Sequence, residues 1–291
     1  LILLIKSHIM KLLPVDRRTG LNRESFKNEY LKKQKPVIFT DFMDQWPAKD
    51  KWNIENLKEK YGHISVPLFS ENSSKPGKKY MVPDTKKSFR EFLEILESGP
   101  TTYRMFLFNI FKHAPELIKD FSIPTIMDGW VKSFPFMFFG GQGSTVPLHY
   151  DIDYSHVFLN QFHGRKRIVL FSHDESDKIY HHPYTVASYI DVNNPDYENY
   201  PALRNVVGYE CMLYPGETIF MPSGYWHYIE YTDGGYSMAL RSNDSVVTQM
   251  KGVINIARHF VVDKSMNHLL GSQWRKMKDN MAKHRAEKYV G

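Results

Sequence analysis

Cysteine is nearly missing from this chain, which has 291 residues and a single cysteine, Cys211. One cysteine excludes an intramolecular disulfide, and with it the small disulfide-stapled scaffolds that are typical of secreted proteins. We therefore expect a reducing, cytoplasmic setting. A chain of this length can bury a large hydrophobic core without covalent cross-links.

Long apolar runs are missing from the N-terminus. The segment LILLIKSHIMKLL begins with five apolar residues, and Lys6 and Lys11 then interrupt it. Such a run is too short for a signal-peptide core or a membrane span, and no small-residue cleavage site follows it. We expect no membrane association. Met10 is a candidate start, with residues 1–9 as an upstream extension.

Sequence signatures of nucleic-acid binding are also absent, although the formal net charge is +6. We find no zinc-finger spacing, no RNA-recognition signature and no glycine loop for a phosphate. Much of the basic excess lies in residues 274–288, WRKMKDNMAKHRAEK. A basic helix of this kind is more often a solvated face than a nucleic-acid arm.

The pattern of apolar, polar and turn-forming residues divides the chain into three stretches. Residues 11–133 mix helical and extended patterns, with helices expected at 24–33, 54–61 and 88–99 and a buried strand at 36–42. Residues 134–245 consist of short apolar or alternating runs separated by Gly, Pro, Asn and Asp, as in HVFLNQFHG and TIFMPSG. These runs predict an antiparallel sandwich or barrel, in agreement with an aromatic content of 14%. Residues 246–291 return to a helical pattern, so the expected fold is mainly β with flanking helices.

Two metal-ligand residue types stand close together in the segment PLHYDIDYSHVF. His149 and Asp151 are two positions apart in an expected strand, where alternate side chains project from the same face. His227 follows in PGETIFMPSGYWHYIE. Two histidines and one carboxylate on one side of a metal form the triad of non-haem Fe(II) oxygenases, which leaves open positions for a co-substrate and O₂.

The triad has competitors and a plainer interpretation. A lone His-x-Asp pair often serves only a hydrogen bond. The chain has 13 histidines, and those competing as ligands are His156, His163, His173, His181 and His182. The β-rich context favours metal binding by the triad, because a small barrel brings strand ends together around its interior.

Lys166 offers a second charged group in the segment HGRKRIVLF. If Ile168 faces inward, Lys166 enters the barrel with it, and a buried ammonium requires an anion. The distal carboxylate of 2-oxoglutarate would supply one. A surface lysine in a basic cluster is the alternative, and the spacing alone does not separate the two.

The residues from about Lys35 to Arg241 resemble the JmjC (cupin-like) oxygenases that depend on Fe(II) and 2-oxoglutarate, and within that family the asparaginyl-hydroxylase branch. The resemblance lies in KPVIFTDF, KW, PLHYD, GRKR, HHP, IDVNNPDYENYPALRNVVGYE and PGETIFMPSGYWHYIE. It implies a double-stranded β-helix (jelly roll) as a catalytic domain over residues 11–245, with its core at about 134–245. It also implies a helical segment at 246–291 that forms a homodimer or caps the same chain.

The resemblance implies that His149, Asp151 and His227 bind iron and that Lys166 pairs with the 2-oxoglutarate C5 carboxylate. Ile229 would cover the apolar side of the co-substrate. Several positions depart from the pattern of the family, and they make the following residues candidates for the co-substrate pocket: Phe106 in place of a Tyr, with Tyr103 near it; Thr145 beside Val146; Asn160 or His156; and Arg241 in place of an Asn. Arg241 is also an alternative partner of the distal carboxylate. Candidates for an apolar wall are Phe138, Phe139, Phe158 and Trp226.

These features predict a hydroxylase that uses Fe(II), 2-oxoglutarate and O₂ on a C–H bond. A protein or peptide side chain is the favoured substrate, and demethylation is less favoured than hydroxylation. A small molecule or a tRNA base is an alternative substrate for the same chemistry. The rival from a different class is a non-catalytic cupin that binds a ligand or Zn²⁺ through the same residues.

Overall fold

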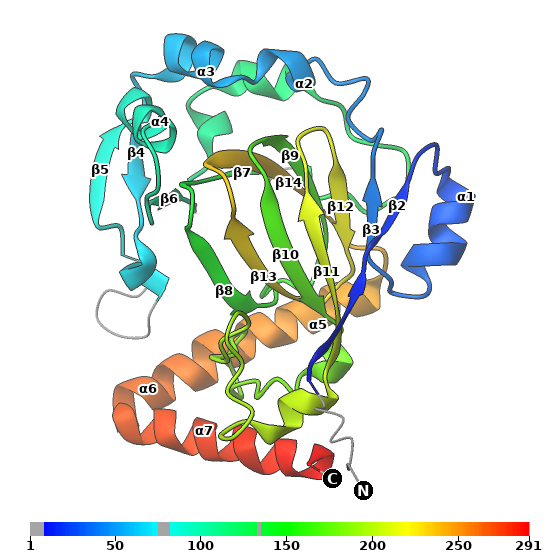
Figure 1. Ribbon diagram of the computed structural model, residues 1–291, viewed down its shortest axis with the longest axis vertical. Coiled ribbons are helices and arrows are strands. Elements are labelled where there is room, and N and C mark those ends of the chain that lie inside the picture. The colour runs from blue at the N-terminus through cyan, green and yellow to red at the C-terminus, as the bar shows by residue number, and fades with distance from the viewer. Residues whose placement is uncertain (1–8, 75–81, 107, 133–134, 291) are drawn as a thin grey trace, which may run out of the picture.

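The computed structural model describes residues 9–74, 82–106, 108–132 and 135–290 (Figure 1). The expectations for residues 1–8, and the first residue of the expected jelly-roll core, 134, lie outside these ranges. The described chain forms two main sheets that face each other and enclose a barrel. In the view of Figure 1, the helices of the N-terminal part lie above and beside the sheets, and a helical hairpin lies below them.

The two sheets form a jelly roll. In spatial order, the five-stranded sheet contains β1 (Lys11–Pro14), β11 (Val207–Leu213), β10 (Lys166–Phe171), β13 (Trp226–Tyr231) and β8 (Thr145–His149). The seven-stranded sheet contains β2 (Asp16–Arg18), β3 (Val37–Phe39), β12 (Thr218–Met221), β9 (His156–His163), β14 (Gly235–Ser242), β7 (Phe136–Gly140) and β6 (Arg104–Met105). A separate hairpin consists of β4 (Ser65–Leu68) and β5 (Thr85–Ser88). The chain crosses repeatedly between the main sheets from β7 to β14, so the expectation of a mainly β jelly roll is confirmed.

Two edge strands were not expected from the sequence. β1 pairs in parallel with β11, and β2 pairs in parallel with β3. Both strands are short and half-exposed, so they lack the clear alternation of apolar and polar residues that marks a central strand.

The helices of the N-terminal part pack on the outer face of the seven-stranded sheet. They are α1 (Arg23–Phe26), α2 (Ala48–Lys51), α3 (Ile54–Tyr61) and α4 (Phe89–Glu97). The expected helix at 24–33 forms as α1 followed by a π-helical stretch, η1 (Lys27–Leu31). Ser88 and Glu91 form a reciprocal capping box that fixes the start of α4. Short 3-10 helices lie at Glu71–Ser74, Ile110–Lys112, Pro115–Asp120, His173–Glu175, Pro201–Asn205 and Glu287–Tyr289.

Strand alternation separates the barrel interior from two outer cores. Ile168 and Ile229 belong to the interior cluster, whereas Phe139 and Phe158 belong to the core between the seven-stranded sheet and the N-terminal helices. Trp226 lies in a third core, outside the five-stranded sheet. Of the four aromatic residues expected to form an interior wall, the interior cluster therefore includes only Phe138.

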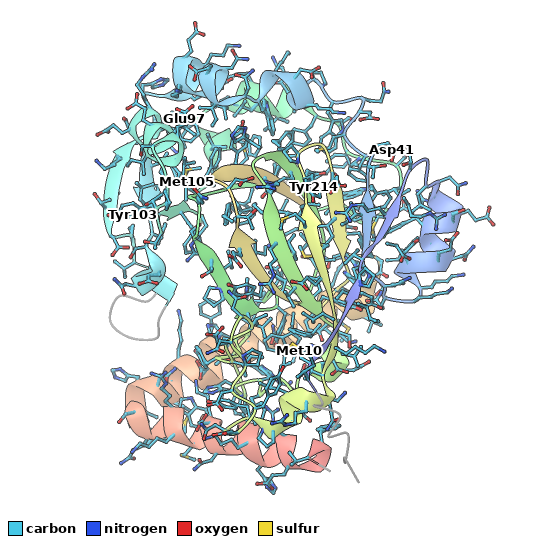
Figure 2. All side chains as sticks on the ribbon, viewed as in Figure 1. Met10, Asp41, Glu97, Tyr103, Met105 and Tyr214 are labelled. Atoms are coloured by element: carbon cyan, nitrogen blue, oxygen red, sulfur yellow. The ribbon has the colours of Figure 1, made fainter. Side chains whose placement is uncertain are left out.

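The C-terminal helices are α5 (Val246–Ala257), the π-helical η7 (Arg258–Asp263), α6 (Lys264–Leu270) and α7 (Ser272–Ala286). α5 crosses the lower end of the barrel in Figure 1, and α6 and α7 form a hairpin beneath it. Met10 lies where the barrel meets this hairpin, in a core that includes Ala282 and Ala286 (Figure 2). Among the described residues, no helix has both the length and the apolar character that a membrane crossing requires.

Candidate metal centre

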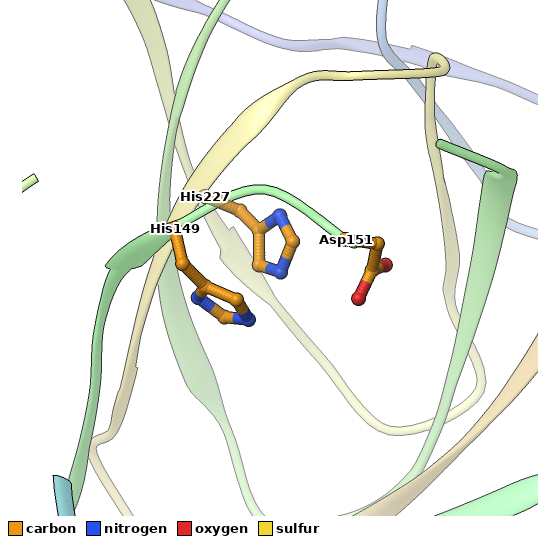
Figure 3. Close-up of side chains that lie close together, drawn as sticks. All are labelled: His149, Asp151 and His227. Carbon is orange, nitrogen blue, oxygen red and sulfur yellow. The ribbon is translucent and has the colours of Figure 1, made fainter. Parts of the chain in front are cut away.

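The side chains of the triad lie close together (Figure 3). His149 is the last residue of β8 and lies opposite His227 of β13 in the strand register. The two ring centroids are 4.2 Å apart. One ligand atom from each of His149, Asp151 and His227 lies within 4.8 Å of the others, and the described residues contain no other such group of His, Cys, Asp and Glu.

The position of Asp151 corrects part of the expectation. β8 ends at His149, so Asp151 lies in the loop beyond the strand. The chain beyond β8 is still held by a backbone contact, since the Tyr150 amide donates to the Val186 carbonyl oxygen over 3.1 Å. The shared face of His149 and Asp151 therefore does not come from strand pairing through both residues.

Backbone carbonyls fix the tautomers of both histidines. Nδ1 of His149 lies 2.9 Å from the Pro147 carbonyl oxygen, and Nδ1 of His227 lies 3.2 Å from that of Tyr225. A carbonyl oxygen can only accept, so each Nδ1 carries the proton and donates it. Each Nε2 is therefore unprotonated and has a lone pair with which it can bind a metal.

The charges of the triad suit a divalent metal. Burial lowers the pKa of His149 to about 4, with a contribution from His227, and burial also lowers the pKa of His227. Burial opposes ionisation of Asp151, but the Arg241 guanidinium and the two histidines together outweigh it and hold the pKa of that carboxyl below its usual range. Two neutral imidazoles and one carboxylate are a donor set that fits Fe(II).

Lys166 enters the barrel interior at the start of β10. Its side chain is 1% exposed, its Nζ donates to the Ser237 hydroxyl, and the Nζ lies 4.4 Å from the centre of the Tyr231 ring. Burial lowers the pKa of Lys166 well below its usual value. Within the described part of the chain no carboxylate pairs with this side chain. A buried lysine in this state fits the carboxylate of an incoming ligand.

Register decides which other expected residues face the triad. Ile229 lies two positions after His227, belongs to the interior cluster and pairs with Val146, whereas Thr145 pairs with Glu230. Cross-strand partners share a face, so Val146 lies beside Ile229 and Thr145 lies on the opposite face. A register irregularity in β8 causes the difference, and its position cannot be deduced from alternation alone.

Asn160 and Phe106 do not offer a free polar group to the triad. Asn160 lies on the Phe158 face of β9, where its amide donates to the Phe158 and Met238 carbonyls and its Oδ1 accepts from Thr218. The ring of Phe106 packs on that of Phe69, with centroids 4.3 Å apart. Tyr103 is labelled beside β6 in Figure 2 and packs against the outer core.

The competing histidines are engaged elsewhere. His156 accepts from the Ser223 amide, and its Nε2 lies 3.2 Å from Asp244. His181 lies 2.7 Å from the Thr185 carbonyl oxygen. The remaining three make other contacts: His163 with Tyr236, His173 with Tyr150 and Tyr154, and His182 with Tyr189 and Asp279.

Three polar residues near the site were missed at the level of sequence. Ser237 and Tyr231 contact Lys166, and both follow from alternation once Arg241 and His227 are placed on the inner face. Arg104 is 5% exposed, and its charge contributes to lowering the pKa of His149. Its segment has only two strand residues, so no periodicity could mark Arg104.

This chain is similar in sequence to known proteins. The family model described as a cupin-like domain matches residues 23–245. Lysine-specific demethylase 8 of Xenopus tropicalis is 29% identical over 236 residues, 74% of this chain and 50% of the relative. Lysine-specific demethylase JMJ30 of Arabidopsis thaliana is 30% identical over 244 residues, 76% of this chain and 54% of the relative. tRNA wybutosine-synthesizing protein 5 of Gallus gallus is 26% identical over 245 residues, 75% of this chain and 74% of the relative.

The fold and the triad thus define a cupin-like protein with a candidate metal centre. The chain belongs to the JmjC family, whose members use Fe(II), 2-oxoglutarate and O₂. It spans about half the length of the two lysine-specific demethylases that it matches. The narrower likeness to asparaginyl hydroxylases stays a prediction.

Proposed function

We propose that this protein hydroxylates a C–H bond of a protein or peptide side chain. The observation that carries the proposal is one interior face with two free imidazole Nε2 atoms, one ionised carboxylate and a buried lysine without a carboxylate partner among the described residues. The chemistry supplied by iron and co-substrate is oxidative: O₂ and 2-oxoglutarate give succinate and CO₂, and one oxygen atom enters the C–H bond.

The side chains of this protein bind and orient. His149, Asp151 and His227 would hold the metal from one side, and the open side faces the interior. Lys166 would bind the distal carboxylate of 2-oxoglutarate at the far end of the same face. Ile229 would cover the apolar part of the co-substrate and exclude water. We assign the catalytic domain to residues 11–245 and infer a cytoplasmic location from the single, buried cysteine.

Protein substrates are supported by the names of two relatives as lysine-specific demethylases. A tRNA substrate is the second candidate, since another relative is named for tRNA wybutosine synthesis and this chain carries a net charge of +6. A small molecule is a third possibility, for which no specific residue argues. A protein substrate is preferred because much of the excess of basic over acidic residues lies on α7, below the barrel rather than in it.

The substrate experiment combines the purified protein with Fe(II), 2-oxoglutarate and a library of peptides, and reads masses. We expect a gain of one oxygen atom on a side chain, lost in His149→Ala and kept in His268→Ala, an exposed histidine of α6. Loss of a methyl group with formaldehyde release would identify a demethylase instead. Salt-sensitive tRNA binding with oxidation of a tRNA base would favour the second candidate.

We also propose that the C-terminal segment 246–291 forms a homodimer. Its helices expose large apolar side chains, namely Val246, Val247, Met250, Val253, Ile254, Ile256, Phe260, Val261, Leu269, Leu270, Met277 and Met281. An apolar surface of this extent marks an interface, and a second copy of the same surface can cover it by two-fold symmetry. Sedimentation should show a dimer that Val253→Glu dissociates and Gln249→Glu, on the same helix, does not. A monomeric wild-type protein would overturn this assignment.

A further inference from the structure

The metal-binding carboxylate needs support from outside its own strand. Asp151 lies beyond the end of β8, in the loop that runs to the start of β9 at His156. α5 contacts this loop from below. A Cβ on Gly252 would meet the Asp153 carbonyl oxygen at 2.2 Å, and the Asn255 amide donates to the Ile152 carbonyl over 2.9 Å. These contacts hold the backbone of the loop but leave the Asp151 carboxylate free to rotate.

Arg241 supplies the contact with the carboxylate itself. It lies in β14 of the seven-stranded sheet, whereas Asp151 follows β8 of the five-stranded sheet, so the pair connects the two sheets. Nη2 donates to Oδ1 of Asp151 over 3.0 Å, and Nη1 lies 2.8 Å from Oδ2. Nη1 also donates to Asp153 Oδ1 over 3.2 Å and to the Ser155 hydroxyl over 3.0 Å.

The two-point contact limits how Asp151 can bind a metal. A carboxylate chelates a metal through both oxygens from its open end, which is the end that a guanidinium fork occupies in an Arg–carboxylate pair. Each oxygen keeps a further lone pair that points to the side. With Arg241 in place, a metal can therefore take one oxygen of Asp151 from the side but cannot take both.

We propose that Arg241 is a positioning residue that restricts Asp151 to a one-oxygen ligand, and thereby keeps metal positions open for 2-oxoglutarate. This inference rests on the proposed function. The sequence offered Arg241 as an alternative partner of the co-substrate, whereas its contacts are with Asp151, Asp153 and Ser155. Its effect on the co-substrate is therefore indirect, through the number of positions that Asp151 occupies on the metal.

The chain contains a matched control for this pair. Arg165 and Asp233 form a comparable two-point contact, with Nε 2.6 Å from Oδ2 and Nη2 3.0 Å from Oδ1. Both side chains are exposed, and Arg165 lies five residues along the chain from Leu170, the register partner of His227. Arg165→Met removes an arginine fork from a carboxylate without touching the metal ligands.

The experiment loads metal-free protein with Co(II) alone, records its visible absorption, and then titrates 2-oxoglutarate into the Co(II) form. Co(II) absorption changes with the number of bound ligand atoms. We expect Arg241→Met to alter the spectrum and to weaken 2-oxoglutarate binding about tenfold or more, as for other residues that orient metal ligands. The Co(II) spectrum and the 2-oxoglutarate affinity of Arg241→Lys should lie between those of the wild type and Arg241→Met, because an ammonium does not reproduce the two-point contact. Arg165→Met should match the wild type in both.

Near-UV circular dichroism reports which variants fold. A folded Arg241→Met protein with the wild-type Co(II) spectrum and 2-oxoglutarate affinity would overturn the inference. If Arg241→Met does not fold, Arg241→Lys decides by the same criteria. A wild-type protein that binds neither Co(II) nor 2-oxoglutarate would overturn the proposed function, and this inference with it, so the two failures are distinguishable.

Discussion

The barrel and the C-terminal hairpin each bury a lysine, but the two side chains have different surroundings. In the hairpin, Lys278 is 5% exposed and its Nζ lies 2.5 Å from Oδ1 of Asp263. The same carboxylate accepts from the Trp274 indole and the Asn267 amide. In the barrel, Lys166 is 1% exposed, and the polar and ring contacts of its Nζ with described residues are those with the Ser237 hydroxyl and the face of Tyr231. The paired lysine belongs to the structure of the hairpin, whereas the other is placed for a ligand.

The difference suggests how to recognise a site among buried charges. A buried charge is costly unless it is paired, so a folded chain tolerates Lys166 at an energetic cost. Arg241 is the contrasting case in the barrel, because its guanidinium is already paired with Asp151 and Asp153 and needs no ligand to neutralise it. We therefore expect Lys278→Met to lower stability and to leave 2-oxoglutarate binding unchanged, and Lys166→Met to do the reverse.

The largest effect on stability is expected for Lys278→Met. Removal of the ammonium leaves Asp263 buried without its cation, which destabilises a protein by about 3–5 kcal/mol. Lys166→Met removes a buried amine that has no carboxylate partner among the described residues and should leave the free energy of unfolding unchanged or increased. Urea unfolding of both variants measures the contrast. Equal destabilisation by both substitutions would remove the distinction between the two lysines.

The contrast should reverse for co-substrate binding. Lys166→Met leaves the distal carboxylate of 2-oxoglutarate without a partner in a buried site, at a cost of about 2–5 kcal/mol, so affinity should fall at least thirtyfold. Lys278→Met should bind 2-oxoglutarate like the wild type, measured below its unfolding temperature by calorimetry. Unchanged affinity in Lys166→Met would place the distal carboxylate elsewhere.

Replacing both members of the hairpin pair sharpens the comparison. The double variant Asp263→Asn with Lys278→Met removes both charges and keeps an oxygen that accepts from the Trp274 indole, so it should be more stable than Lys278→Met alone. The two single substitutions should therefore be strongly non-additive. Additive losses in urea unfolding would mean that the pair contributes no coupling.

The smallest expected effect is the uptake of protons when 2-oxoglutarate binds. Burial lowers the pKa of Lys166 in the free protein, and a bound carboxylate raises it again by favouring the charged form. The complex therefore holds more protons on Lys166 than the free protein, and binding takes up as much as one proton at a pH between the two pKa values. Calorimetry in buffers of different ionisation enthalpy measures this uptake, which Lys166→Met should abolish. Proton release on binding would contradict the assigned charge state.

Regular elements followed well from the sequence because they depend on local periodicity. The helix at Ile54–Tyr61 and the strands from β9 to β14 lie where apolar spacing indicated them. The triad also came together, with strand pairing accounting for His149 and His227. Long-range geometry decided the rest. The irregularity in β8 exchanged Thr145 for Val146 on the inner face, and the contact of Arg241 with Asp151 joins two different sheets.

The most direct test of the account is an anaerobic titration of the metal-free protein with Fe(II) and 2-oxoglutarate, followed by visible absorption. We predict a weak charge-transfer band that requires both components, is absent in His149→Ala, persists in His268→Ala and needs far more 2-oxoglutarate in Lys166→Met. Absence of the band in wild-type protein, together with tight retention of zinc, would contradict the assignment of the triad as an iron centre.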